Sequence, residues 1–597
     1  MRAEAVGISK RPAFGVARSF SGRRWFLRDG DEEAVRSLAR DAKISLALAQ
    51  LLHARGVDLT TVEDFLRPTL KRLLPEPRLL KDMDRAVARV AAAIESGQAI
   101  AVFGDYDVDG SSSSALLHDF LSALGTPPRI YIPDRLTEGY GPTAHALLRL
   151  KEEGASLVVT VDCGAGAREA LGAAHEAGLD IVVLDHHAVH ELPPAFAHIN
   201  PNQPGDVSKQ GHLSAAGVTF LFVVALSRAL RESGWYSRTG IVEPDLRNGL
   251  DLVGLSTICD VVPLEGVNRA FVRWGLAKLA EGARPGLAAL VVQAKASAPF
   301  TPYHFGFILG PRINAGGRVG RSSLGVELLT SRDPAAAQEI AAQLDLHNKE
   351  RQALETMILE EAIALASMQD NQPFLLTASE GWHSGVVGIV AGRLKDRFNK
   401  PAFVAGFEGG MGRGSARSVA GIDIGALVRG AQEAGIIDAG GGHAMAAGFS
   451  LSAHQLEPFR AYLADKFAHA DEALLAAGDL DIEAIVSPAA ATASLVAEMA
   501  LAGPFGAGNP EPVVVAPDVQ LAFADVVGKN HVRMRLIGGD GARLDAIAFR
   551  AADTPLGKAL LGARGRRIHV AGRLRAEEWQ GRTRVQIHVE DAAASGA

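Results

Sequence analysis

Three apolar segments in the first half of the chain each end in an acidic residue, and this pattern constrains the fold more than any other feature. The segments are 100–103, 157–161 and 181–184, and helix-like sequence separates them. Continuous apolar strands that alternate with helices are typical of a parallel sheet covered on both faces. Ligands of such sheets bind beyond the carboxyl ends of the strands, so we expect the residues that follow these strands to converge.

The residues that follow the three strands are mainly carboxylates. They comprise three aspartates at alternate positions, then a single aspartate, then an aspartate with two histidines: Asp105, Asp107 and Asp109, Asp162, and Asp185-His186-His187. Two like charges 4 Å apart repel by about 4 kcal/mol at an effective dielectric of 20, so a cluster of this kind requires a cation. A metal ion is the simplest compensation.

Each cluster also has an ordinary structural explanation. An aspartate after a strand often caps a helix or turns the chain, and adjacent histidines in a loop are commonly solvated. Three such clusters at the same edge of one sheet favour a metal site over these alternatives.

The chain has 597 residues, which exceeds the size of one hydrophobic core. We expect a basic, flexible N-terminal tail with a helical lead-in (1–80), then a parallel-sheet domain (81–295). A segment with a long connecting helix (296–368), a second α/β domain (369–468) and a β-rich domain (469–597) follow.

Overall charge and cysteine content exclude few functions. The net charge is −7, so a nucleic-acid partner cannot be inferred from the whole-chain balance. No secretory leader and no apolar stretch of about 20 residues is apparent, which predicts a cytoplasmic protein. The two cysteines, Cys163 and Cys259, are too few for a disulfide framework, and we expect them to be reduced and buried.

In order and spacing, the strand-end motifs resemble the first three motifs of the DHH phosphoesterase family. A later segment resembles the fourth, with Cys259 where alanine is common, and another resembles a motif of the RecJ-type exonucleases within that family. Two further segments are similar to the DHH-associated domain. The matching segments are 105–110, 161–164 and 185–187, then 258–264, 310–318, 382–390 and 440–448.

The resemblance implies a set of metal ligands, in which Asp162 bridges two ions. These ligands are Asp107, Asp109, Asp162, His186 and Asp260. Asp105 is either a ligand or an acceptor behind the ligands, and His187 either faces the scissile phosphate or makes a structural hydrogen bond; with Asp162 they are the candidate catalytic residues. A carboxylate shell with one imidazole suits two divalent ions, Mn²⁺ in preference to Mg²⁺.

The resemblance also implies residues that bind phosphate groups of the substrate. A pocket for a 5′-phosphate is expected from Arg135, Ser415 and Arg417, and His443 lies in a glycine-rich segment that suits close approach to a phosphate. A tight turn with a core histidine is the alternative for that segment. The RecJ-type motif contributes Arg312, Asn314 and Arg318.

The last part of the chain alternates polar and apolar residues, which predicts strands with basic side chains on one face. We expect a five-stranded OB-fold that binds nucleic acid through Arg533, Arg535, Arg573 and Arg575, with Trp579 as a stacking platform. A solvated basic face on an ordinary barrel is the alternative.

The predicted fold class is therefore multidomain α/β, with a parallel-sheet DHH domain and a DHH-associated domain joined by a long helix, and a C-terminal OB-fold. The resemblance implies a single-strand-specific 5′→3′ DNA exonuclease of DNA repair and recombination, whose cleft excludes duplex. It also implies a monomer, with single-strand-binding protein and a helicase as partners. The alternatives are a DHH phosphatase acting on short oligonucleotides and a non-catalytic strand-binding scaffold.

Overall fold

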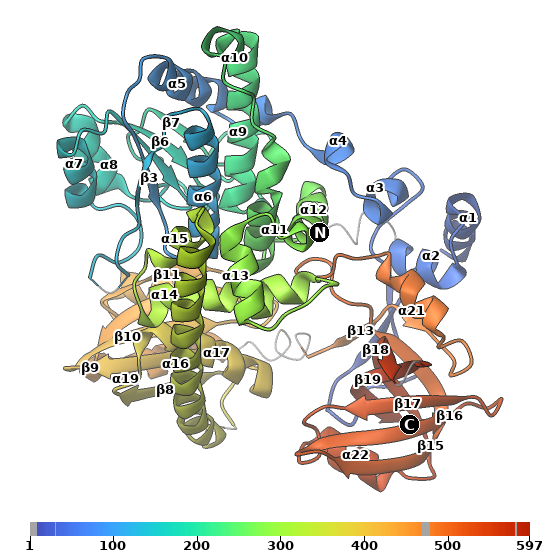
Figure 1. The fold of residues 1–597 in the computed structure, drawn as a ribbon. Helices are drawn as coiled ribbons and strands as arrows, with labels where there is room; N and C mark the ends of the chain where they lie inside the picture. The colour runs from blue at the N-terminus through green and yellow to red at the C-terminus, as the bar shows by residue number, and fades with distance from the viewer. Residues whose placement is uncertain are drawn as a thin grey trace. The chain divides into compact units, whose positions relative to one another are not determined.

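The computed structural model describes residues 9–29, 31–135, 137–369, 371–468, 478–579 and 582–596 (Figure 1). The chain divides into two compact units. One unit contains residues 67–351 and 504–510, and the other contains residues 1–66, 352–503 and 511–597.

The first unit is built on a five-stranded parallel sheet with the order β4-β3-β5-β6-β7. Its strands are β3 (Ile100–Gly104), β4 (Arg129–Tyr131), β5 (Leu157–Val161), β6 (Asp180–Leu184) and β7 (Ala197–Ile199). Every residue of β3 and β5 is buried, as continuous apolar strands in a doubly covered sheet should be. The predicted parallel sheet is confirmed.

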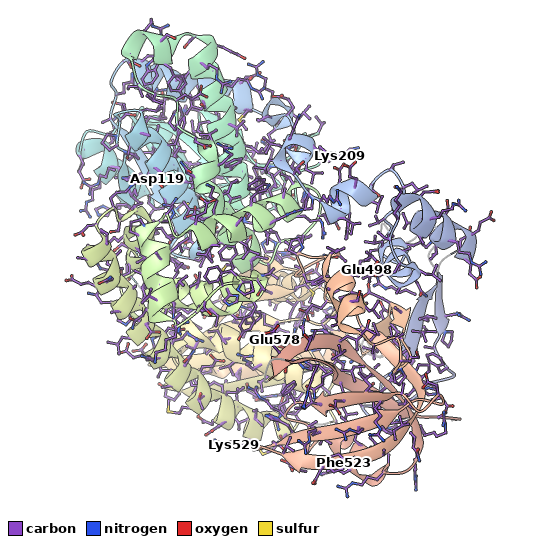
Figure 2. All side chains as sticks on the ribbon, turned by 45° about the vertical axis from the view of Figure 1, so that its right-hand side comes forward. Asp119, Lys209, Glu498, Phe523, Lys529 and Glu578 are labelled. Carbon is purple, nitrogen blue, oxygen red and sulfur yellow. The ribbon has the colours of Figure 1, made fainter. Side chains whose placement is uncertain are left out.

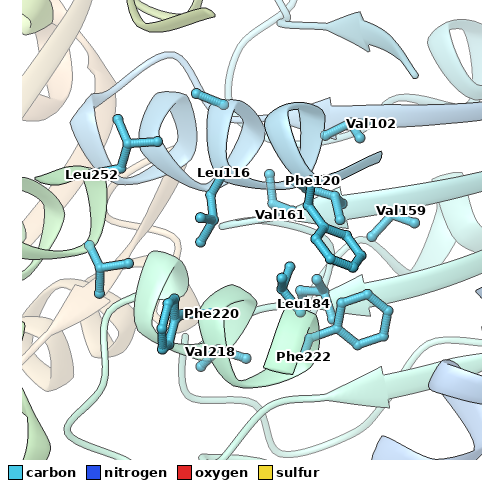
Figure 3. Packing of buried hydrophobic residues seen from close by; sticks show 14 of the residues in the cluster. Val102, Leu116, Phe120, Val159, Val161, Leu184, Val218, Phe220, Phe222 and Leu252 are labelled. Carbon is cyan, nitrogen blue, oxygen red and sulfur yellow. The ribbon is translucent and has the colours of Figure 1, made fainter. Parts of the chain in front are cut away.

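Helices cover both faces of this sheet. Side chains of α5 (Met83–Glu95), α6 (Val108–Ala123) and α9 (Ala215–Glu232) share one core with alternate strand residues, and Figure 3 shows Phe120, Phe220 and Phe222 in this core. Side chains of α7 (Ala144–Glu152) and α8 (Arg168–Glu176) form the core on the opposite face. The two cores fix the sheet, and with it the edge where the carboxylates lie.

Mainly helical segments complete the first unit. In chain order the main ones are α10 (Trp235–Thr239), α11 (Leu250–Cys259), α12 (Val267–Glu281), α13 (Pro285–Gln293), the π-helix η4 (His304–Leu309), α14 (Gly310–Val319) and α15 (Leu324–Thr330). The long helix α16 (Pro334–Ser367) begins in this unit and continues into the second, where the sequence predicted a connecting helix.

The second unit contains a mixed five-stranded sheet with the order β11-β12-β10-β9-β8. Its strands are β8 (Leu375–Glu380), β9 (Ala402–Glu408), β10 (Met411–Arg417), β11 (Ala439–His443) and β12 (Ala446–Ser452). Helices α17 (Ser384–Phe398), α18 (Ile424–Glu433) and α19 (Leu456–Phe467) pack on this sheet.

A closed five-stranded barrel forms the C-terminal part of the second unit, as expected for an OB-fold. Pairing of the first strand with the fourth along the chain closes it. Its strands are β15 (Val514–Val527), β16 (His531–Ile537), β17 (Arg543–Ala548), β18 (Arg567–Trp579) and β19 (Arg582–Ala594).

Residues 9–29 differ from the flexible tail that their basic composition predicted. They form β1 (Ser9–Pro12) and β2 (Trp25–Asp29), and β2 pairs in parallel with β13 (Leu480–Ile482). The cause is long-range pairing: Arg24 Nε lies 2.7 Å from Asp479, and the fully buried Trp25 donates to Asp591 at 2.9 Å. Helices α1 (Glu32–Ala42) and α2 (Leu46–His53) follow, as the helical spacing predicted.

Candidate metal centre

The first acidic motif lies in the tight turn between β3 and α6. A Cβ atom at Gly110 would lie 2.5 Å from the carbonyl oxygen of Asp105, so only glycine allows this close approach. Asp107 is the N-cap of α6, and its Oδ1 accepts hydrogen bonds from the backbone N–H groups of Asp109 and Gly110 at 2.9 and 3.0 Å. The helix-cap explanation therefore holds for one oxygen of Asp107.

Asp109 is buried inside the first turn of α6 and is fixed by two other helices. Its carboxylate accepts hydrogen bonds from the backbone N–H groups of Ala215 and Ala216, at 2.7 and 2.8 Å, where α9 begins. The hydroxyl of Ser256 in α11 donates to it at 2.5 Å. These contacts hold the carboxylate rigidly at the sheet edge.

Asp162 and His186 meet at the centre of this edge. Asp162 follows β5 directly and has a positive φ of 61°, a conformation in which aspartate is several-fold enriched. The Nδ1 atom of His186 lies 2.9 Å from the carbonyl oxygen of Leu213 and donates to it, which leaves Nε2 as a lone-pair donor. His186 Nε2 lies 3.4 Å from Asp162 Oδ1 and 3.6 Å from Asp260 Oδ2.

The side chains combine into three groups whose ligand atoms lie within 4.8 Å of one another. Asp162 belongs to two of the groups and His186 to two. The groups are Asp105-Asp107-Asp162, Asp162-His186-His187 and Asp109-His186-Asp260. The buried atoms Asp105 Oδ1, His186 Nε2 and Asp260 Oδ2 have no hydrogen-bond partner in the described part of the chain, as expected of atoms that bind a cation. This donor set fits divalent metal ions.

The charges at the sheet edge lead to the same conclusion. Burial raises the pKa of Asp105, Asp109, Asp162 and Asp260, and the negative charges of neighbouring aspartates raise it further. The carboxylates therefore repel one another when ionised, and a bound cation is needed to keep all of them charged at neutral pH.

Asp185 holds His187 instead of completing a ligand group. Its Oδ1 accepts from the backbone N–H of His186 at 2.7 Å and from His187 Nδ1 at 2.8 Å. Burial alone would raise the pKa of Asp185, but the hydrogen bond from His187 and its charge lower it to about 2. Burial disfavours charge on His187, but its bond to Asp185 raises its pKa to about 9, so His187 is a cation at neutral pH.

Two asparagines beyond the fifth strand of the sheet support both histidines, and the sequence analysis missed them. Asn200 Nδ2 donates to the carbonyl oxygen of His187 at 2.8 Å, and Asn202 Nδ2 donates to that of His186 at 2.7 Å. Asn200 follows β7 directly and Asn202 lies two residues further on, so the strand-end rule applied to the short run 197–199 could have found them.

The residues of segment 310–318 mainly hold the site together. Asn314 Oδ1 accepts from the backbone N–H of Val108 at 3.0 Å and so caps α6. Arg312 Nε lies 2.9 Å from Asp345 of α16, so its charge is already compensated. The structure therefore gives Arg312 and Asn314 contacts within the protein and not the phosphate contacts that the motif predicted. Arg318, half-buried at the end of α14, remains a candidate for phosphate binding.

The other predicted phosphate ligands fall in different units. Arg135 belongs to the first unit, where its guanidinium lies 5.1 Å from the centre of the Tyr106 ring. Ser415 and Arg417 lie on β10 of the second unit, and Arg417 Nη1 donates to Ser415 Oγ at 2.7 Å. Burial lowers the pKa of Arg417, and none of the described carboxylates pairs with it. His443 is exposed at the end of β11.

Most of the predicted cations of the barrel pair with acidic side chains. Arg535 Nε lies 3.1 Å from Asp545, Arg573 Nη2 lies 2.6 Å from Glu590, and Arg575 contacts Glu511. These pairs reduce the positive charge that the strand pattern predicted for this face.

Arg533 is the exception among the four arginines. It is exposed, and its guanidinium lies 5.7 Å from the ring centre of Phe523, which Figure 2 labels. The side chain of Trp579, the predicted stacking platform, lies outside the described residues.

Both cysteines are free; Cys163 is buried and Cys259 is half-buried. No helix in the described ranges is long and apolar enough to span a membrane.

The sheet edge and the domains that follow it define a metal-dependent hydrolase of the DHH class. Family models for the DHH family N-terminal domain, the DHHA1 domain and the RecJ OB domain match residues 99–241, 371–469 and 482–591. The chain is 36% identical over 560 residues to the single-stranded-DNA-specific exonuclease RecJ of Dickeya dadantii, covering 91% of this chain and 95% of the relative. It is 33% identical over 570 residues to that of Escherichia coli, covering 92% and 96%.

Solved structures agree with these relatives. The crystal structure of RecJ in complex with Mn²⁺ from Thermus thermophilus has a TM-score of 0.77 and 27% identity, covering 95% of this chain and 78% of that chain. The Mg²⁺ complex from the same organism has a TM-score of 0.71. The chain belongs to the RecJ family.

Proposed function

We propose that this chain is a single-stranded-DNA-specific exonuclease that hydrolyses phosphodiester bonds with two divalent ions, Mn²⁺ in preference to Mg²⁺. The observation that carries the proposal is the sharing of Asp162 and His186 among three ligand groups within 4.8 Å, which suits two adjacent cations. The relatives named single-stranded-DNA-specific exonucleases, and the RecJ complexes with Mn²⁺ and Mg²⁺, support the substrate and the metals.

We assign the metals to Asp107, Asp109, Asp162, His186 and Asp260, which would hold them when bound, and Asp162 belongs to two of the three ligand groups. Asp105, whose Oδ1 has no hydrogen-bond partner among the described residues, is a further ligand or an acceptor behind them. When bound, a pair of divalent ions supplies a water nucleophile at neutral pH and offsets charge that develops on the phosphoryl oxygens.

His187 supplies positive charge beside the scissile phosphate. Asp185 fixes its ring, Asn200 holds its backbone carbonyl, and its raised pKa keeps the ring protonated at neutral pH. A protonated imidazole donates a hydrogen bond to a phosphoryl oxygen more strongly as negative charge accumulates on it. In this assignment His187 binds the transition state and does not accept the proton of the attacking water.

We propose that Ser415 and Arg417 bind a terminal 5′-phosphate, which gives digestion in the 5′→3′ direction. A half-buried guanidinium without a carboxylate partner among the described residues favours an anionic ligand, and its bond to Ser415 orients it. His443, Arg135 and Arg318 are further proposed contacts of the strand phosphates, and Arg533 is the proposed contact within the barrel.

End-labelled strands test chemistry, substrate and direction together. Wild type in Mn²⁺ should degrade a 5′-phosphorylated single strand from its 5′ end and leave blunt duplex intact. Asp162→Ala should be inactive, and the control Asp245→Ala, which removes an exposed aspartate paired with Arg247, should retain activity. Equal activity of Asp162→Ala and wild type would contradict the metal assignment.

The 5′-phosphate assignment has its own test. Arg417→Ala should lose the preference for 5′-phosphorylated over 5′-hydroxyl strands, whereas Arg460→Ala, on α19 of the same unit, should keep it. An unchanged preference in Arg417→Ala would contradict this assignment.

Several further properties remain predictions from the family. They are roles in DNA repair and recombination, a cytoplasmic location, a monomeric state, and single-strand-binding protein and a helicase as partners.

Neither alternative function accounts for the whole chain. A phosphatase for short oligonucleotides has no evident use for the closed barrel at residues 514–594, and a non-catalytic scaffold has no use for three complete ligand groups.

A further inference from the structure

Two aromatic side chains beside α14 are unusually exposed. Phe307 is 69% exposed and Tyr303 58%, the highest values for aromatic side chains among the described residues. Their rings stack on each other, with centres 5.2 Å apart and an angle of 19° between the planes. Large apolar side chains that remain exposed together mark binding surfaces more often than isolated ones do.

The helix that carries these rings is anchored next to the metal centre. Phe305 and Leu309 of η4 are fully buried, so its opposite side presents Phe307 to solvent. Cys259 Sγ lies 3.4 Å from the carbonyl oxygen of Phe305, and the residue after Cys259 is Asp260. Movement of η4 would therefore disturb the segment that positions this proposed ligand.

The stretch of sequence around these rings lacks acidic residues. Between Glu281 and Glu327 the sequence contains no Asp or Glu, in a protein with 68 acidic residues and a net charge of −7. The same stretch contains five cations, Arg284, Lys295, Arg312, Arg318 and Arg321, and three of them, Arg284, Arg312 and Arg321, pair with carboxylates from other segments or from the end of the stretch. Lys295 is exposed, and no described carboxylate lies within ion-pair distance of it. Exposed, stacked aromatic rings in a stretch without acidic residues suit single-stranded nucleic acid, because its bases can stack on the rings and no carboxylate of the stretch repels its phosphates.

We propose that Tyr303 and Phe307 form a stacking platform for bases of the single strand outside the metal centre. The proposal rests on the proposed exonuclease function and deepens it, because the platform contacts nucleotides beyond the one that is cleaved. Stacking does not depend on base identity, since every base has a flat aromatic face. The platform thus holds the strand in place without sequence preference.

Strands with and without bases distinguish this role from a structural one. The full-length protein is titrated in EDTA, which prevents hydrolysis, against labelled oligothymidine and a strand of abasic residues of equal length, with fluorescence anisotropy as the readout. Phe307→Ala and Tyr303→Ala should each weaken oligothymidine binding about fivefold or more and leave abasic-strand binding nearly unchanged. Phe307→Trp should retain the affinity, as should Val292→Ala, which truncates an exposed apolar residue of the same stretch that has no ring.

Equal losses on both strands, or no loss on either, would overturn the platform. Digestion in Mn²⁺ separates this outcome from failure of the exonuclease proposal. If wild type binds the strand but does not digest it, the proposed function fails and the comparison of the two strands still decides the platform. If wild type digests the strand and Phe307→Ala binds like wild type, only the platform fails.

Discussion

Replacing Asn314 with alanine should weaken metal binding while leaving strand binding largely intact. The sequence motif suggested that Asn314 binds phosphate, whereas its side-chain oxygen accepts the N–H of Val108 at 3.0 Å. That bond caps the helix whose first turn carries Asp107 and Asp109. Its loss should therefore misplace two proposed ligands without removing either.

The size of the effect follows from the burial of the orphaned donor. Val108 is 1% exposed, so its N–H would lose its partner in a place that water reaches poorly. Leaving such a donor unsatisfied costs about 1–3 kcal/mol, and loss of a helix cap typically costs ~0.5–2 kcal/mol. Loss of a partner behind the ligands lowers metal affinity by roughly 10- to 100-fold. We expect both losses in Asn314→Ala.

Mn²⁺ affinity is measured by titration calorimetry on metal-free protein, and KM is measured for a 5′-phosphorylated strand at saturating Mn²⁺. The control Asn248→Ala removes an exposed asparagine on η3 (Leu246–Gly249), away from the sheet edge, and should change neither value. Unchanged Mn²⁺ affinity with a raised KM in Asn314→Ala would refute the capping argument and restore direct phosphate binding.

Three further predictions concern stability. Burial and neighbouring aspartates raise the pKa of Asp260, so the metal-free fold should lose stability as pH rises above about 4, where the unfolded carboxyl ionises. In EDTA, the fall of Tm with rising pH should be smaller for Asp260→Asn than for wild type, and the variant should be inactive. An unchanged slope of Tm against pH would contradict the reasoning. Ser113 is fully buried with no partner for its hydroxyl among the described residues, so Ser113→Ala should stabilise the protein by about 0.5–2 kcal/mol in urea unfolding, whereas destabilisation would indicate a hidden hydrogen bond. Arg284 pairs with Asp251 and Asp119 at 2.7 and 2.8 Å, so Arg284→Leu should cost about 3–5 kcal/mol in the same assay, and a loss below about 1 kcal/mol would show that the aspartates find other partners.

Local sequence predicted the elements that carry the metal centre. The strand expected at 157–161 is Leu157–Val161, and the helix expected from Ala335 to Met368 is Pro334–Ser367. The strand is a short, continuous apolar run that is buried on both faces, and the helix has apolar residues at largely helical spacing over a length that no strand reaches. Strand β2 was not predicted, because pairing with β13, more than 450 positions away, leaves no local signal, and β1 was missed with it because β1 pairs with β2.

Local sequence also could not predict which charged side chains of the barrel would pair. Alternation along β16 and β18 indicated an exposed basic face, but it could not reveal that Asp545, Glu511 and Glu590 would approach from other segments. Asn200 and Asn202 were missed because β7 has only three residues, too few for a periodic pattern.

The sequence by itself determined which side chains meet. Parallel strands place their carboxyl ends at one edge, so Asp105, Asp162 and Asp185 had to converge wherever the helices packed. The tertiary structure decided what each side chain does there: Asp185 is used by backbone N–H groups and His187, whereas Asp260 keeps an oxygen without a partner among the described residues. Asp109, in turn, is held by hydrogen-bond partners from α9 and α11, parts of the chain whose local pattern reports only their own packing.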